Sequence, residues 1–169
     1  MTLTDPQIPV KPALAGPPKE LLSSTTFLLK RLGFAAKDRT HDAFEGTGLN
    51  AFHFAVLSLL EEDPRETQAV IADALGYDRG HLVRLLDELE ERHLVVRTRD
   101  PADRRRHVVK LTADGRKTLG EMRTVVSKLE DEFMAPLDAD ERAVLHALLL
   151  RLLSEHDPRC RLFGPAPTV

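Results

Sequence analysis

The sequence predicts a mainly α-helical protein that carries one small β-hairpin. Two observations lead to this fold class. Apolar residues recur three and four positions apart through most of the 169 residues, which is the spacing of helices with one buried face. The exception lies near the middle, where two Val-rich stretches with alternating side chains, 95–99 and 107–111, flank a turn that contains Asp100 and Pro101.

Two short helices are expected immediately before this hairpin. The first covers about 68–75, with Thr67 as its N-cap and Gly76 at its end, where glycine adopts the left-handed conformation at little cost. Asp78 caps the second helix after a three-residue turn. The apolar stripe of this second helix consists of leucines three and four positions apart: Leu82, Leu85, Leu86 and Leu89. This is the helix-turn-helix pattern, in which the second helix enters the major groove of DNA.

A hairpin that follows a helix-turn-helix makes a winged helix, and the tip of this wing is strongly basic. Three consecutive arginines, Arg104, Arg105 and Arg106, stand at the expected tip, where arginine suits the narrow and negative minor groove. From Arg97 to Lys117 there are eight basic and three acidic residues, a local charge of +5 in a chain of net charge −3. Charge is therefore polarised in the way that phosphate binding requires.

The stretch from Leu86 to Gly115 resembles the MarR (multiple antibiotic resistance regulator) family of bacterial transcriptional regulators. The residues that match the wing of this family are Asp103, Arg105, Leu111, Thr112 and Gly115. With the helices on either side, the resemblance covers about residues 20–156. Two positions depart from the pattern: Gly80 replaces a Ser or Thr that is frequent early in the second helix, and His93 replaces the Gly that is usual near its end.

Contacts with double-stranded DNA are predicted from the helix-turn-helix and from the wing. The predicted DNA-binding residues are Thr67, Gln68, Arg79, Gly80, His81, Arg84, Arg104, Arg105 and Arg106. Asp103 is expected to orient the neighbouring arginines, because a carboxylate repels phosphate. Two alternatives stay open: Arg84 could pair with Glu88 one helical turn away, and Thr67 could act as a cap alone.

The flanking segments are expected to be helices that hold two copies of the chain together. Residues 1–18 form a flexible Pro-rich arm, 19–48 an N-terminal dimerisation helix, 49–112 the winged helix-turn-helix, 113–157 the C-terminal dimerisation helices and 158–169 a tail. Within the C-terminal part, Asp138 and Glu141 have the spacing of a capping box. The predicted architecture is therefore mainly α with a small β-wing: a winged helix-turn-helix plus N- and C-terminal dimerisation helices. The resemblance implies the same two-fold homodimer.

The resemblance also implies a small, often phenolic or anionic, effector that enters a cleft between the dimer helices and the winged helix. By position, this cleft is expected to be lined by Phe27, Phe52, His53, Val56 and Arg84. For His53, which lies within an apolar helix, the favoured alternative is a core histidine whose hydrogen bonds are satisfied.

The sequence lacks the motifs of enzymes, metal-binding proteins, disulfide-rich proteins and membrane proteins. No enzyme motif is present, so catalytic residues and cofactors are not expected. The single cysteine, Cys160, excludes a disulfide framework, and redox sensing by its thiol is the less favoured reading. The seven histidines lack the spacing of a metal site. Neither a signal peptide nor a membrane-spanning run is found, so a cytoplasmic protein is expected.

The sequence thus predicts a sequence-specific DNA-binding transcriptional regulator, a repressor that binds a pseudo-palindromic operator as a homodimer. The alternative is a winged helix used for protein interaction without sequence-specific DNA binding. The charge of +5 around the wing argues against the alternative, because such a module has no need of arginines at the tip.

Overall fold

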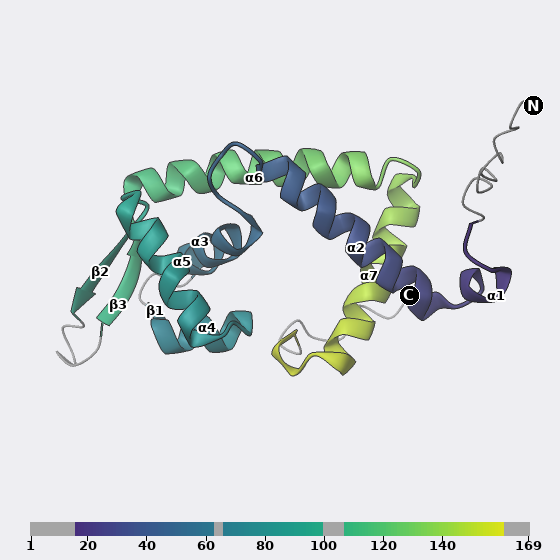
Figure 1. Ribbon diagram of the computed structural model, residues 1–169, viewed down its shortest axis with the longest axis horizontal. Coiled ribbons are helices and arrows are strands. Elements are labelled where there is room, and N and C mark those ends of the chain that lie inside the picture. Colours follow the sequence, from purple (N-terminus) through teal and green to yellow (C-terminus); the bar gives the residue numbers. More distant parts are fainter. Residues whose placement is uncertain (1–15, 63–65, 100–106, 161–169) are drawn as a thin grey trace, which may run out of the picture. The chain divides into compact units, whose positions relative to one another are not determined.

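The computed structural model describes residues 16–62, 66–99 and 107–160. The chain divides into two compact units, residues 1–37 and 38–169. The first unit contains α1 (Lys19–Leu22) and most of α2 (Thr25–Phe44), both visible in Figure 1. Its leucines are largely exposed, with Leu32 reaching 53%.

One helix is predicted within residues 19–48, but the structure divides it into α1 and α2, which corrects the prediction of a single helix. The hydroxyl of Ser23 donates to the carbonyl of Glu20 at 2.7 Å and ends α1. The hydroxyl of Ser24 then accepts from the amide of Phe27 at 3.4 Å. Two consecutive serines thus offer the backbone local hydrogen bonds that compete with a continuous helix.

The helix-turn-helix forms as predicted. It consists of α4 (Gln68–Leu75) and α5 (Arg79–Glu91), and it is preceded by α3 (Ala51–Glu62). The Thr67 hydroxyl accepts from the amide of Val70, and Asp78 accepts from the amide of His81. Gly76 takes the left-handed conformation, with φ of 66°. Both predicted caps and the glycine stop are confirmed.

The wing contains three strands, one more than the sequence analysis predicts. Strands β2 (Val95–Arg99) and β3 (His107–Leu111) pair antiparallel, with Arg99 opposite His107. A two-residue strand, β1 (Glu66–Thr67), pairs with the other edge of β3 and gives the order β1-β3-β2. This strand is too short to leave an alternating pattern in the sequence, so its pairing was missed.

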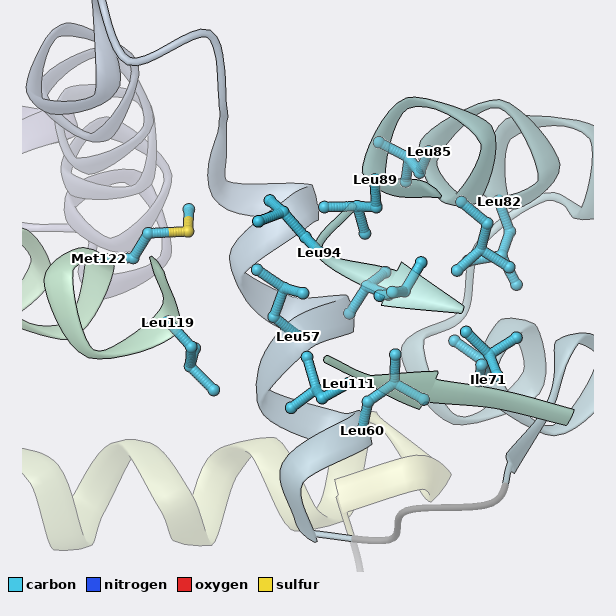
Figure 2. Packing of buried hydrophobic residues seen from close by; sticks show 14 of the residues in the cluster. Leu57, Leu60, Ile71, Leu82, Leu85, Leu89, Leu94, Leu111, Leu119 and Met122 are labelled. Carbon is cyan, nitrogen blue, oxygen red and sulfur yellow. The ribbon is translucent and has the colours of Figure 1, made fainter. Parts of the chain in front are cut away.

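One apolar core joins α3, the helix-turn-helix and the sheet. Leu57 and Leu60 of α3 meet Ile71 of α4 and the four predicted leucines of α5, and all of these are at most 4% exposed. Leu119 and Met122 enter the same core from α6, as Figure 2 shows. Helix α6 packs mainly on α3 and also meets β3, so it joins the core that supports α5.

The C-terminal part consists of α6 (Ala113–Phe133), α7 (Ala139–His156) and a 3₁₀ turn (Pro158–Cys160). Asp138 and Glu141 form the predicted capping box at the start of α7. In α7 no residue is buried, although the helix is rich in leucine. Its exposed large apolar residues are Val144, Leu148, Leu149, Leu152 and Leu153. Within the ranges described, no helix has the length and apolar character needed to cross a membrane.

Candidate DNA-binding surface

Three of the predicted DNA-binding residues surround one open hollow at the start of the helix-turn-helix. Thr67 and Gln68 reach it from the beginning of α4, and Arg79 reaches it from the first turn of α5. The hollow has a volume of about 490 Å³ and is also lined by Val83 and His107. Free amides at the start of α4, together with Arg79 and His107, give this surface donors that suit phosphate oxygens.

His107 was missed by the sequence analysis. It is the first residue of β3, and nothing in its local sequence relates it to the start of α4. The pairing of Thr67 with Val108 brings it there. Such a neighbour could be found only by knowing that β1 exists, and β1 has two residues.

Arg84 is exposed on the outer side of α5. The alternative pairing with Glu88 is not found, because the carboxylate of Glu88 instead lies 2.9 Å from Nε2 of His53. No ion pair of Arg84 is recorded among the described residues. Gly80 lies close by on the same helix, where a Cβ would come within 3.2 Å of the Asp78 carboxylate that caps α5.

His81 lies on α5 but faces sideways, toward α3. Its ring is 5.0 Å from that of Phe52 and 5.9 Å from that of Tyr77, both in edge-on arrangements. The Nε2 atom of His81 is buried and has no hydrogen-bond partner in the part of the chain described. Contact with DNA stays a prediction for His81, and in this arrangement it would have to use Nδ1.

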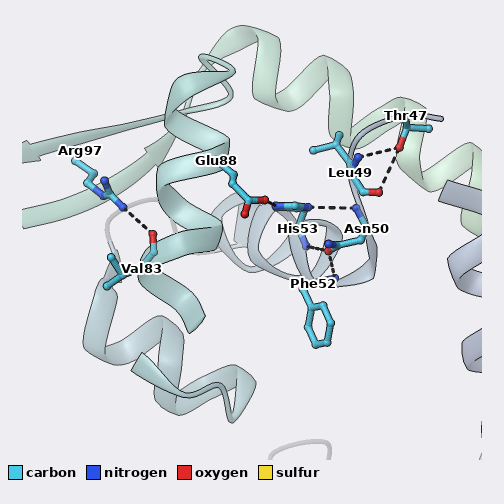
Figure 3. A network of polar contacts seen from close by, with 8 residues as sticks. All are labelled: Thr47, Leu49, Asn50, Phe52, His53, Val83, Glu88 and Arg97. Carbon is cyan, nitrogen blue, oxygen red and sulfur yellow. Dashed lines mark hydrogen bonds and ion pairs between the residues drawn. The ribbon is translucent and has the colours of Figure 1, made fainter. Parts of the chain in front are cut away.

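His53 is a buried core histidine that ties α3 to α5. The Asn50 side chain accepts from the amide of His53 at 3.1 Å, and the Asn50 amide donates to Nδ1 of His53 at 3.2 Å. This reciprocal pair is a capping box in which a histidine replaces the usual Glu or Gln. Because Nδ1 accepts, Nε2 carries the proton and donates to Glu88, as Figure 3 shows.

The environment of His53 favours its neutral form. Burial lowers the pKa of His53 below its usual value. The carboxylate of Glu88 opposes this shift through its charge and its hydrogen bond, while Arg92 and His81 add to the lowering. Protonation would also place a second proton on Nδ1, where the Asn50 amide already donates, and would remove that half of the capping box, while the Asn50 side chain could still accept from the amide of His53.

The predicted effector-binding residues do not line one cleft in the second unit. Val56 and His53 are 0% and 1% exposed and belong to the core, and Phe52 packs on Tyr77 at 5.3 Å. Phe27 lies in the first unit. Arg84 is on the outer side of α5. A contact between these residues and an effector stays a prediction, but His53 and Val56 could be reached only if the core opened.

A different cavity lies beneath the end of α5. It has a volume of about 390 Å³ and is bounded by the end of α2, the loop before α3, the end of α5 and α6. Its lining residues are Phe44, Thr47, Leu49, Arg92, Leu94, Thr118, Glu121, Met122 and Val125. Most of the wall is apolar, and Arg92 supplies a guanidinium for which no ion pair is recorded among the described residues.

Arg97 connects the wing to α5. It extends from β2, and its Nη1 lies 2.6 Å from Asp87 and 2.9 Å from Glu90. Its Nη2 donates to the carbonyl of Val83 at 3.4 Å, which can be followed in Figure 3. Arg97 therefore belongs to the structure of this surface, although the sequence alone places its charge among those available to phosphate.

The predicted wing-tip residues Asp103, Arg104, Arg105 and Arg106 lie outside the described residues. The strands that lead to them end at the paired residues Arg99 and His107. Among the residues that the structure does describe, no three His, Cys, Asp or Glu side chains gather in a way that could hold a metal ion.

The chain is similar to known regulators of transcription. A sequence model of the MarR family matches residues 47–106. A candidate transcriptional regulatory protein for the hcr operon of Thauera aromatica is 33% identical over 99 residues, which are 59% of this chain and 60% of that protein. The chain thus spans about 60% of the length of this relative.

Two solved structures resemble the fold closely. The transcriptional repressor CouR, bound to a 23-mer DNA duplex, has a TM-score of 0.72 and 36% identity, and the match covers 79% of this chain and 94% of CouR. The PcaV transcriptional regulator from Streptomyces coelicolor, in complex with its natural ligand, has a TM-score of 0.69 and 26% identity. That match covers 85% of this chain and 100% of PcaV.

Proposed function

This chain belongs to the MarR family of transcriptional regulators, and on that premise we propose that it is a homodimeric repressor of transcription. In this proposal two copies bind a pseudo-palindromic operator, and a small anionic effector releases them. The two α5 helices would enter successive major grooves, with half-sites roughly 34 Å apart. CouR is a repressor bound to a DNA duplex, which supports the assignment.

The observation that carries the proposal is the pairing of charges on α5. Three of its four acidic residues are engaged by other side chains, because Arg97 bridges Asp87 and Glu90 and the neutral ring of His53 donates to Glu88. The arginines Arg79 and Arg84 remain exposed without a recorded partner among the described residues. The contacts hold Asp87, Glu88 and Glu90 against neighbouring elements, and the free arginines of the first two turns can offer donors to guanine and phosphate.

The wing completes the proposed contact. Arg104, Arg105 and Arg106 would reach the minor groove or the phosphates beside it, and Asp103 would orient them. Thr67, Gln68 and Gly80 would lie against the backbone at the edge of the major groove. The exposed leucines of α7 and of the first unit would supply the dimer contact, since a large exposed apolar surface marks an interface.

The cavity beneath the end of α5 is the proposed effector site. Its apolar walls suit an aromatic ring, and Arg92 suits a carboxylate. Arg92 is also the C-cap residue of α5, so a ligand there touches the helix that reads DNA. A ligand lowers DNA affinity only if it binds better to the form whose helices do not match the operator.

The test is fluorescence anisotropy of the full chain with promoter-region DNA fragments at several salt concentrations. Preference for a palindromic fragment is expected, with a steep salt dependence. Arg84→Ala should weaken binding to that fragment by about tenfold or more, and Arg105→Ala should lower the salt slope by about one. Lys128→Ala removes the same charge from an exposed site of α6, away from the proposed DNA contacts and the leucines of α7, and should change neither. Equal, weak binding of all fragments by all variants would reject the proposal and favour a protein-interaction module.

The effector site is tested with 4-hydroxybenzoate as a phenolic anion probe. The wild-type chain should show a raised Tm and release from DNA, and Arg92→Ala should show neither. A raised Tm that is equal in both proteins would place the binding elsewhere.

A further inference from the structure

The starting observation is one exposed apolar side chain on the DNA-facing helix. Val83 is 41% exposed, whereas the other large apolar residues of α5 are at most 4% exposed. It lies at the hollow that Arg79, Gln68 and His107 also line. An apolar group thus stands among the donors that the proposed function places against DNA.

The position of Val83 is fixed by its surroundings. A β-branched residue has one strongly preferred χ1 rotamer in a helix, so its methyl groups point in a defined direction. The carbonyl of Val83 accepts from Arg97 Nη2 at 3.4 Å, and Arg97 is itself anchored by Glu90 at 2.9 Å. Both the backbone and the side chain are therefore held before any ligand arrives.

The major groove offers one strongly apolar feature to such a residue, the C5-methyl group of thymine. We propose that Val83 is a specificity-determining residue that packs on a thymine methyl group in each half-site. The inference rests on the proposed function and adds to it one base identity that the arginines do not supply. Burying one methyl group corresponds to a preference of about fourfold for thymine over uracil in each half-site.

An exposed valine can also be an ordinary surface residue, since single exposed apolar residues are common. Val96 provides the matched comparison. It is 40% exposed, and it lies on β2 rather than on the helix that would enter the groove. The two valines have nearly the same exposure, so a difference between their variants reflects position.

The experiment begins with selection of an operator for the wild-type chain from a random DNA library. Each thymine of the selected site is then replaced symmetrically by deoxyuridine, which removes the C5-methyl group and keeps the pairing. Binding is measured by anisotropy for the wild-type chain, Val83→Ala and Val96→Ala, and circular dichroism checks that all three are folded.

One symmetric replacement should weaken wild-type binding by about sixteenfold, which is the fourfold effect of each half-site multiplied together. Val83→Ala should bind the thymine and uracil sites equally, and Val96→Ala should behave as the wild type. The role of Val83 is wrong if the wild type selects a site but binds every uracil site as tightly as the thymine site. It is also wrong if Val83→Ala keeps the full difference in affinity between the two sites. In both cases the proposed function stands. If the wild type selects no site, both are wrong.

Discussion

The guanidinium of Arg97 on β2 lies 2.9 Å from the carboxylate of Glu90 on α5 and joins the wing to the helix that would read DNA. The same Nη1 contacts Asp87 at 2.6 Å, and the amide of Arg97 donates to Glu90 at 3.0 Å. The side chain of Arg97 is only 18% exposed. One residue thus holds together the two elements that would contact DNA in the proposed function.

Arg97→Met is expected to destabilise the fold and weaken DNA binding without changing the number of phosphate contacts. Loss of the guanidinium leaves Asp87 and Glu90 unpaired, which costs about 1 kcal/mol of unfolding free energy, because both carboxylates are partly exposed and water can hydrate them. DNA affinity should fall while the slope of log K against log salt stays at the wild-type value. Urea unfolding and salt-dependent anisotropy measure the two effects.

Arg97→Lys is the matched control for the shape of the guanidinium. Lysine keeps the charge but has no planar fork with which to bridge two carboxylates and a carbonyl. It should recover only part of the stability. If Arg97→Met instead lowers the salt slope by about one, as expected for Arg105→Ala, then Arg97 contacts phosphate and its positioning role is wrong.

The comparison of Arg97 with the caps shows which features the sequence could predict. Thr67, Gly76 and Asp78 act on amides or turns within four residues, so their pattern in the sequence contains the whole interaction. Arg97 with Glu90, and His53 with Glu88, join different elements, and their pairing depends on how the helices pack. Burial by packing is likewise hard to predict from sequence: Val56 is predicted to line the effector cleft, but packing of α3 against the core leaves it 0% exposed.

The stability of the protein is expected to fall below about pH 6.5 because of His53. Burial lowers the pKa of this histidine in the folded state, so the unfolded chain binds a proton at a higher pH than the folded chain does. Between the two pKa values the unfolded state binds more protons, and the free energy of unfolding decreases as the pH falls. Urea unfolding at pH 7.5 and at pH 5.5 measures the loss.

His53→Gln separates this effect from the other histidines. Glutamine at the same position can complete a capping box with Asn50 and does not titrate. The variant should lose less stability than the wild type between the two pH values. An equal loss in both proteins would show that His53 contributes nothing to the pH dependence.

His93 occupies a backbone conformation that suits glycine better. Its φ is 60°, just after the end of α5, and its side chain is exposed. A residue with a Cβ costs about 1–2 kcal/mol there, which glycine avoids. His93→Gly should therefore raise the free energy of unfolding by roughly 0.5–1 kcal/mol, after the greater flexibility of glycine in the unfolded chain is subtracted.

His93→Ala distinguishes relief of strain from removal of the imidazole. Alanine keeps the Cβ, so its Tm should stay at or below that of the wild type while His93→Gly melts higher. Thermal unfolding by circular dichroism gives both values. Equal gains in the two variants would attribute the effect to the side chain rather than to the backbone.

Gly115 is required by the approach of α6 to the hairpin. A Cβ at this position would lie 2.0 Å from the carbonyl oxygen of Leu94, and that backbone is fixed because it also accepts from the amide of Thr112 at 3.1 Å. Gly115→Ala should therefore destabilise the protein by about 3 kcal/mol or more, since neither partner can move aside. Among the wing residues that match the MarR family, Leu111, Thr112 and Gly115, the glycine is therefore required for steric reasons.

Gly120 lies in the same helix and provides the opposite case. Nothing lies within 4 Å of a Cβ at this position. Gly120→Ala should therefore stabilise α6 by up to about 1 kcal/mol, because alanine is the better helix former. Urea unfolding of Gly115→Ala and Gly120→Ala separates steric conflict from helix propensity. If both variants are more stable than the wild type, α6 can shift away from Leu94. If both are less stable, α6 needs the flexibility of glycine, and the close approach to Leu94 is not the cause.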